Sequence, residues 1–227
     1  MTTSEAGVTT ETQPHKLERK WTFWFDNQSK PKQGAAWGSS LRNVYTFDTV
    51  EEFWSLYDQT FKPSRLTMNA DFHLFKAGVE PKWEDPECAN GGKWSVTSNR
   101  KATLDTMWLE TMMALIGEQF DEADEICGVV ASVRQRQDKL ALWTKTASNE
   151  AAQVFYVLLP LRERKRLQIR FVIAALSFAF NSAVIWNLVQ MSIGKKWKEI
   201  IDVTERITYS FHDDSRRERS VKSRYNV

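Results

Sequence analysis

Short stretches of alternating apolar and polar residues recur along the chain and predict β-strands. The segments with strand character are residues 21–25, 41–47, 71–75, 93–97, 128–134, 139–145 and 207–211. The polar run from Gln135 to Asp138 separates two of them, which is a hairpin pattern. The sequence therefore predicts a sheet built largely from antiparallel strands.

Apolar residues at helical spacing predict helices between these strands. Thr49 and Glu52 have the spacing of a capping box, so a helix is expected to begin there. Residues 104–116 form the clearest helix, with an apolar face ended by Gly117. A further helix is expected from Asn149. This pattern predicts an α+β fold, a curved antiparallel sheet with about three helices on its convex face and an open concave face.

Residues 154–190 do not fit this plan. Residues 171–189 carry no charge, a length that could just span a bilayer, although polar residues interrupt it. Joining Gln153 directly to Met191 restores one amphipathic helix, so the segment is predicted to be an insertion that breaks a helix.

The ends of the insertion suggest an origin. Val154 has codons that begin GT, and Gln190 has a codon CAG, which are the end signatures of an unspliced intron. We hypothesise an in-frame retained intron. The alternatives are a transmembrane helix and an ordinary long apolar loop, which would be unusual in a compact domain.

Composition limits the function classes. A length of 227 residues suits one domain, and a net charge of +2 gives no chain-wide basic surface, so any nucleic-acid contact must be local. Two cysteines and three scattered histidines give no zinc spacing, so neither a metal nor a cofactor is expected. Residues 1–14 are Thr- and Glu-rich and are predicted to be a disordered tail rather than a signal peptide, ahead of a domain at residues 15–227. A cytoplasmic location, with a nuclear fraction, is expected.

Ten tryptophans are the most informative residues of the chain. Trp37 and Trp83 lie in segments rich in Lys, Gly and Pro, where burial in a core is hard to picture. Both are candidates for stacking against a flat ligand.

Several motifs in order resemble the eukaryotic initiation factor 4E family, and the plant isoform class within it. They include WTFWFDN (21–27), EPKWEDP (80–86), MWLETMMALIGEQF (107–120) and DKLALWTK (138–145). The resemblance covers nearly all of residues 15–153 and 191–227. It implies binding of the 7-methylguanosine cap of mRNA and recruitment of a scaffold initiation factor of the 4G type.

The resemblance also implies roles for the cap-site residues. Trp37 and Trp83 would sandwich the cationic base, Glu84 would accept hydrogen bonds from the guanine edge, and Trp143 would contact the N7 methyl group. Arg134, Arg136 and Lys139 would bind the phosphates, and a common strand parity is expected to turn both arginines the same way. Weaker candidates for the phosphate site or the pocket rim are Lys32, Gln33, Gly34, Ala35, Ala36, Arg65, Arg216, Arg217 and Lys93.

A second, helix-side surface is implied for the scaffold factor. Its expected residues are His15, Val50, Trp54, Leu109, Glu110, Met113 and Gly117. Between two candidate tryptophans, Trp54 is predicted to be exposed and Trp108 to be core. Viral genome-linked proteins are further expected partners, and no stable membrane association is expected apart from the insertion.

Two alternatives remain open from the sequence. Cys88 and Cys127 could form a redox-dependent disulfide, as in plant relatives, or stay reduced as ordinary cytosolic thiols. The chain is expected not to be an enzyme, because no nucleophile–base pair or P-loop is present. The insertion, however, could leave a defective or membrane-adherent variant with impaired cap binding.

Overall fold

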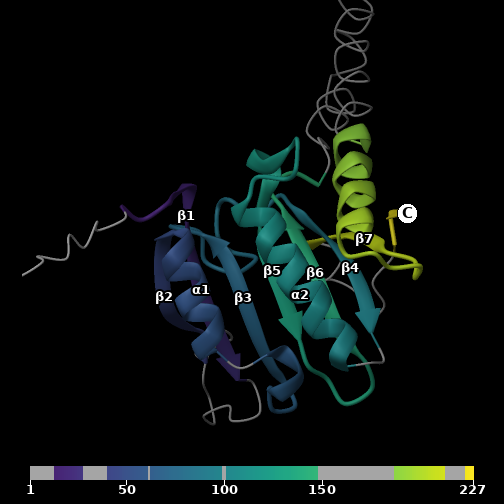
Figure 1. Ribbon diagram of the computed structural model, residues 1–227. Helices are drawn as coiled ribbons and strands as arrows, with labels where there is room; N and C mark the ends of the chain where they lie inside the picture. Colours follow the sequence, from purple (N-terminus) through teal and green to yellow (C-terminus); the bar gives the residue numbers. More distant parts are fainter. Residues whose placement is uncertain (1–12, 28–39, 61, 99–100, 148–186, 213–222) are drawn as a thin grey trace, which may run out of the picture.

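The computed structural model describes residues 13–27, 40–60, 62–98, 101–147, 187–212 and 223–227 (Figure 1). Its strands are β1 Lys16–Asn27, β2 Arg42–Thr49, β3 Ala70–Lys76, β4 Gly92–Ser98, β5 Ile126–Ser132, β6 Asp138–Thr144, β7 Thr208–Phe211 and β8 Tyr225–Asn226. They form one sheet in the order β2-β1-β3-β5-β6-β4-β7-β8 with antiparallel neighbours. The predicted α+β class is confirmed.

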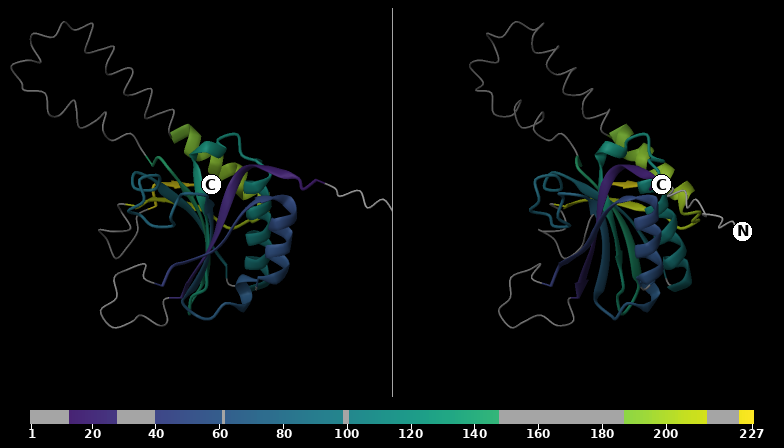
Figure 2. Two further views of the ribbon diagram at one scale, coloured as in Figure 1. Left: turned by 90° about the vertical axis from the view of Figure 1, so that its left-hand side faces the viewer. Right: turned by 60° about the vertical axis from the view of Figure 1, so that its left-hand side comes forward.

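The helices cover one face of this curved sheet, and the loop between β3 and β4 projects from the other (Figure 2). They are α1 Val50–Gln59, α2 Lys101–Ile116 and a helix at residues 187–200, with short 3-10 turns η1 Pro63–Arg65 and η2 Ala123–Glu125. The expected capping box begins α1. The Glu52 amide donates to Thr49 Oγ1 at 3.2 Å, and the Asp48 amide donates to Glu52 Oε2 at 3.0 Å.

The main core lies between the sheet and the helices. Alternate strand residues such as Phe72, Leu74 and Trp94 point into it. The apolar face predicted for α2 is buried there, with Leu104 and Trp108 at most 2% exposed. From helix 187–200, the fully buried Trp197 donates its Nε1–H to Thr111 Oγ1 at 2.9 Å. The fold is therefore closed on this side by a dry, aromatic-rich layer.

The helix at residues 187–200 begins inside the segment predicted to be an insertion. Residues 187–190 were assigned to the insertion, yet they continue the helix without a break. Val189 packs against the core, and the buried Gln190 donates its Nε2–H to the Thr146 carbonyl at 2.8 Å. The Asn187 side chain accepts a hydrogen bond from the Tyr225 hydroxyl. The end of the segment thus supplies its own contacts to the fold.

The remaining calls on the insertion and the tail lie outside the described residues. They concern residues 1–12, 148–153 and 154–186. In the part of the chain that is described, no helix has the length and apolar character needed to cross a membrane.

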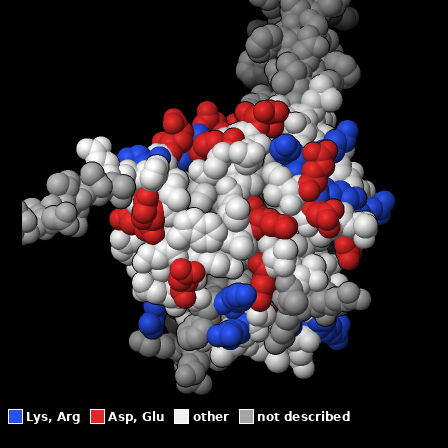
Figure 3. Space-filling view, in the orientation of Figure 1, with Lys and Arg blue, Asp and Glu red and all other residues white. Residues whose placement is uncertain are grey.

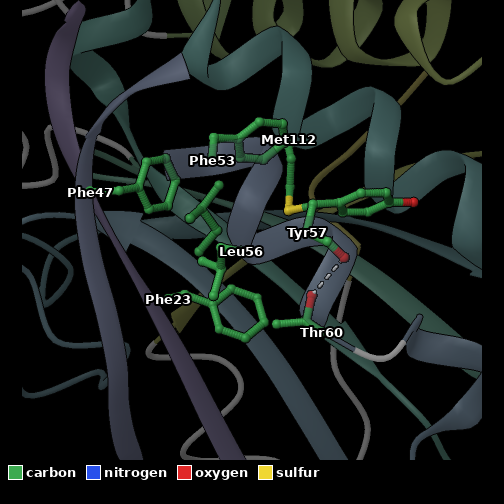
Figure 4. A pocket seen from close by; sticks show the side chains of 8 residues that line it. Phe23, Phe47, Phe53, Leu56, Tyr57, Thr60 and Met112 are labelled. Atoms are coloured by element: carbon green, nitrogen blue, oxygen red, sulfur yellow. Dashed lines mark hydrogen bonds between the residues drawn. The ribbon is translucent and has the colours of Figure 1, made fainter. Parts of the chain in front are cut away.

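A small apolar cavity lies beneath α1 on the helix side (Figure 4). Side chains from β1, β2, β3, α1 and α2 line it, and at its edge the Thr60 hydroxyl donates to the Tyr57 carbonyl at 3.3 Å. The lining residues are Phe23, Phe47, Phe53, Leu56, Tyr57, Thr60, Leu74 and Met112. It lies within the apolar layer and is separate from the concave face.

Candidate ligand-binding cavity

The concave face of the sheet holds a cavity of about 560 Å³, part of it open to solvent. Residues from five strands and three loops surround it, combining aromatic, basic and acidic side chains. They are Asp26, Leu41, Asp71, His73, Pro81, Trp83, Lys93, Val130, Ser132, Arg134 and Trp143. Such a mixture suits a ligand that is flat at one end and charged at the other.

Trp83 forms one wall from the loop between β3 and β4. The Asp85 carboxylate holds this loop in shape, because it accepts hydrogen bonds from the amides of Glu80 and Glu87, both at 2.9 Å. Trp83 therefore stands on a braced turn, half-buried, with Glu84 exposed beside it. A ring held in this way can stack on a planar base without first being ordered.

The floor beneath Trp83 is aromatic and basic. Trp143 of β6 is 6% exposed and lies with its ring centroid 5.5 Å from Phe75 and 4.3 Å from His212. Lys93 is its cross-strand neighbour on β4, and the Lys93 ammonium lies 5.7 Å from the centroid of the Trp83 ring. This contact is a cation–π arrangement, which shows that the Trp83 face already accommodates a positive charge.

Arg134 is the best-anchored cation of the site. Its Nη2 lies 2.8 Å from Asp71 Oδ1 and 2.9 Å from Oδ2, and its Nη1 donates to the Val133 carbonyl at 3.0 Å. The Arg134 amide donates to Asp138 Oδ1 at 3.1 Å. The prediction that a common strand parity turns Arg134 and Arg136 the same way is wrong. Strand β5 ends at Ser132, and both arginines lie in the loop between β5 and β6.

Burial alters the two lysines of the floor. Burial, together with the neighbouring Lys139 ammonium, lowers the pKa of Lys93 to about 8. Burial and the Arg134 charge likewise lower the pKa of Lys139. Three like charges held together in a partly dry site favour an anion, since a bound anion would relieve their repulsion.

The opposite end of the cavity is acidic. Asp26, Asp71 and His73 line it and are all buried. Burial lowers the pKa of His73 to about 4, an effect that Asp71 and Asp26 oppose and Arg134 reinforces, so the imidazole is neutral at neutral pH. The concave floor is thus acidic over β1 and β3 and basic over β4 and β6.

The structure brings together only part of the expected site. Trp83, Arg134 and Trp143 line the cavity, with Lys139 beside Ser132 at its floor, whereas Arg65 and Arg136 are exposed residues that do not line it. The base-stacking candidate Trp37 and the other predicted rim residues lie outside the described residues; the rim residues are Lys32, Gln33, Gly34, Ala35, Ala36, Arg216 and Arg217.

Sequence reasoning missed the acidic end. Its signal was present in β3, where Asp71 and His73 alternate with the core residues Phe72 and Leu74. Two polar residues at alternate positions of a strand that is otherwise buried indicate a polar site on its second face.

The predicted scaffold surface lies on the convex side, over α1 and α2. Trp54 is 40% and Met113 45% exposed, whereas Trp108 is 2% exposed, which confirms the expected assignment of the two tryptophans. His15 lies beside α1, with its Nδ1 2.6 Å from Glu51 Oε1. Val50, Leu109 and Glu110 are half-buried, and Gly117 is exposed. Figure 3 shows uncharged surface over α1 and α2 with acidic side chains on either side.

Cys88 and Cys127 are both free and buried, and they pack in one cluster with Phe75, Trp143 and Trp83. The Cys127 thiol donates to the Glu87 carbonyl at 3.3 Å. The hydrogen bond to Cys127 and burial raise the pKa of the Cys88 thiol. The two thiols therefore share one apolar environment, and their pairing stays a prediction.

Residues 16–171 match the model of the family described as "Eukaryotic initiation factor 4E". The chain belongs to this family. Among initiation factor 4E proteins it is 68% identical to eukaryotic translation initiation factor isoform 4E of Prunus domestica, over 99% of this chain and 88% of that protein. It is 67% identical to the isoform 4E of Nicotiana tabacum, over 99% and 93%. The resemblance to the plant isoform class is thus confirmed.

Solved structures of initiation factor 4E have the same fold. A complex of the C. elegans factor 4E-3 with the 4E-binding protein Mextli and a cap analog has a TM-score of 0.70 at 33% identity, covering 94% of this chain and 99% of that one. A schistosome factor 4E complexed with m7GpppA and a 4E-binding protein has a TM-score of 0.73 at 26% identity, covering 95% and 100%.

Proposed function

We propose that the chain binds the 7-methylguanosine cap of mRNA on the concave face of its sheet and recruits a scaffold initiation factor through α1 and α2. The observation that carries the proposal is the braced Trp83 ring above a floor of three cations, in the fold that binds cap analogs in its structural relatives.

The base end of the ligand would stack on Trp83. Methylation at N7 makes the base cationic, and each indole face contributes about 0.5–2 kcal/mol to such a contact. Glu84, exposed beside Trp83, is the group that would accept the guanine N1–H and N2–H. Together, charge and hydrogen-bond pattern would distinguish 7-methylguanine from guanine and adenine.

The phosphate end would lie over Lys93, Lys139 and Arg134. Arg134 is fixed in place by Asp71, so little side-chain entropy is lost when it meets a phosphate. We infer that the chain acts by binding alone. Lys93, Lys139 and Arg134 would hold the phosphates, and no residue is proposed to cleave them. The alternative of a defective or membrane-adherent variant is not supported by the comparisons.

A pair of matched tryptophan variants tests both surfaces. Trp83→Ala is expected to lower affinity for 7-methyl-GTP by roughly tenfold or more, because the stacking face is lost. Trp54→Ala is expected to abolish binding of a scaffold peptide of the Tyr-x-x-x-x-Leu type and to leave affinity for 7-methyl-GTP unchanged. Isothermal titration calorimetry of both variants with both ligands measures this.

Three measurements identify the results that would contradict the proposed function. Unmethylated GTP should bind far more weakly than 7-methyl-GTP to the unaltered chain, and equal affinities would contradict the cap proposal. Glu84→Ala should cost about 2–3 kcal/mol of cap binding. Loss of both ligands in Trp54→Ala would contradict the separate scaffold surface.

A further inference from the structure

Asp26, Asp71 and His73 occupy one patch at the acidic end of the cavity. Asp26 on β1 lies directly opposite Asp71 on β3, and Trp24 lies opposite His73. Residues opposite each other in an antiparallel pair share a face, as do residues two apart in a strand. One ligand atom from each of the three side chains lies within 4.8 Å of the others.

Without a ligand, the buried charges and unsatisfied polar atoms of this patch destabilise the folded chain. Two carboxylates facing each other across a strand pair repel, and here they are 7% and 2% exposed. Arg134 lies against Asp71 at 2.8 Å and compensates part of that charge from one side. On the other side stands His73, 7% exposed, and neither of its ring nitrogens has a hydrogen-bond partner among the described residues. Such a buried and unsatisfied donor–acceptor group calls for a ligand.

We propose that Asp26, Asp71 and His73 form a binding site for a divalent metal ion of the zinc class at the floor of the cavity. One imidazole nitrogen and two carboxylate oxygens are a set that zinc accepts, with further positions left open. The three ligand atoms need only a small contraction to reach a common ion, because they come from side chains rather than from backbone. The open side faces the cavity that these residues line.

Arg134 limits the affinity of this site. Its guanidinium competes with the ion for Asp71 and repels it, so binding is expected to be weaker than at a four-ligand structural zinc site. The metal site does not depend on the cap proposal, since the ion requires only the folded concave face.

The test uses the full chain with Co²⁺, which reports its coordination through visible absorption, and with Zn²⁺ in calorimetry. One ion per chain is expected. His73→Ala and Asp26→Asn should each weaken binding by at least about tenfold, since each removes a ligand. His15→Ala is the matched control, because His15 is an exposed histidine whose imidazole lies against Glu51, away from the cavity lining, and it should bind the ion as the unaltered chain does.

Two outcomes would overturn the proposal. One is the absence of saturable binding to the full chain. The other is binding that survives in His73→Ala and disappears when Cys88 and Cys127 are replaced by serine, which would place the ion on the thiols. If His73→Ala does not fold, as judged by circular dichroism, Asp26→Asn decides alone. Retention on a cap resin in the presence of a chelator tests the cap proposal separately.

Discussion

The two faces of the sheet are built from alternating residues of the same strands, yet they bury different chemistry. On the convex face, Tyr209 and Trp197 join a layer in which their polar atoms are paired: the Tyr209 hydroxyl lies 2.8 Å from Thr144 Oγ1, and the Trp197 Nε1–H donates to Thr111 Oγ1 at 2.9 Å. On the concave face, Asp71 and His73 are equally inaccessible, but they line a cavity. Burial alone therefore does not separate structural from functional residues. The separating feature is that the unsatisfied ring nitrogens of His73 belong to a cavity-lining residue, whereas Trp94 Nε1, also without a partner among the described residues, lies inside the apolar layer.

Tryptophan truncation on the two faces should give the largest contrast. Trp197→Ala should lower the free energy of unfolding by about 3–5 kcal/mol, because it opens a cavity in the apolar layer. Trp83→Ala should lower it by about 1 kcal/mol or less, since the ring is half-buried in a loop. Urea denaturation of both variants measures the difference. Equal losses of stability would mean that Trp83 belongs to a core.

Removing one cation from the concave face should have a smaller effect. Arg134→Met leaves Asp71 facing Asp26 without its ion pair and should cost about 2 kcal/mol of stability. The matched control is Lys16→Met, whose partner Asp48 lies in an exposed pair and which should cost clearly less stability than Arg134→Met. Thermal denaturation compares the two. A cost for Lys16→Met as large as that for Arg134→Met would remove the distinction between the two pairs.

Lys76, at the edge of the convex face, allows the effect of burial to be tested through the pH dependence of stability. Burial lowers the pKa of Lys76 to about 8 from its ordinary 10.5, and its Nζ donates to the Ala123 carbonyl at 2.8 Å. Between these two pKa values the unfolded chain binds a proton that the folded chain does not, so this lysine makes stability rise with pH from about 8 to 10.5. Below pH 8 its destabilising contribution is fully present.

Lys76→Met should abolish that rise. The quantity to measure is the difference in unfolding free energy between the unaltered chain and Lys76→Met at several pH values, because other titrating groups cancel in it. A difference that stays constant from pH 7 to 10 would refute the effect of burial on Lys76.

The smallest effect is expected at the inserted segment. Deleting residues 154–190 leaves Glu-Ala-Ala-Gln before Met191, whereas deleting residues 150–186 leaves Asn-Leu-Val-Gln. The first has the better helix formers, and the second keeps the observed contacts of Val189 and Asn187. The two shortened chains should therefore agree within about 1 kcal/mol in stability. A large deficit in either would show that one of the two tetrapeptides does not complete the helix. The retained-intron hypothesis itself needs sequencing of the transcripts.

Strand pattern and capping were sufficient to predict most of the fold. The alternation in β5 and β6 predicted their hairpin, and the capping box at Thr49 predicted the start of α1, because these signals are local. The bounds of the insertion, residues 154–190, stay a prediction, because residues 187–190 form a helical turn before Met191 and the excised sequence predicts one there as well. Helical periodicity alone does not predict which of the two tetrapeptides, residues 150–153 or 187–190, packs against the core before Met191.

The site was only partly predictable. Trp83, Arg134 and Trp143 were found through family motifs, and each lines the cavity. The patch of Asp26 and His73 was not found, because it depends on the pairing of β1 with β3, which brings together residues 47 positions apart. Without a strand register, three separate polar residues carry no signal of proximity.

The hydrogen bond between Gln190 and Thr146 has a practical consequence for protein engineering. It ties the two chain ends that flank the intervening segment, with 2.8 Å between Gln190 Nε2 and the Thr146 carbonyl oxygen. Ends that are already fixed side by side make the length between them nearly irrelevant to stability, since the entropy of closing a loop grows only logarithmically. The junction is therefore a natural place to splice in a fluorescent reporter domain, whose own termini lie close together, without disturbing either face of the sheet.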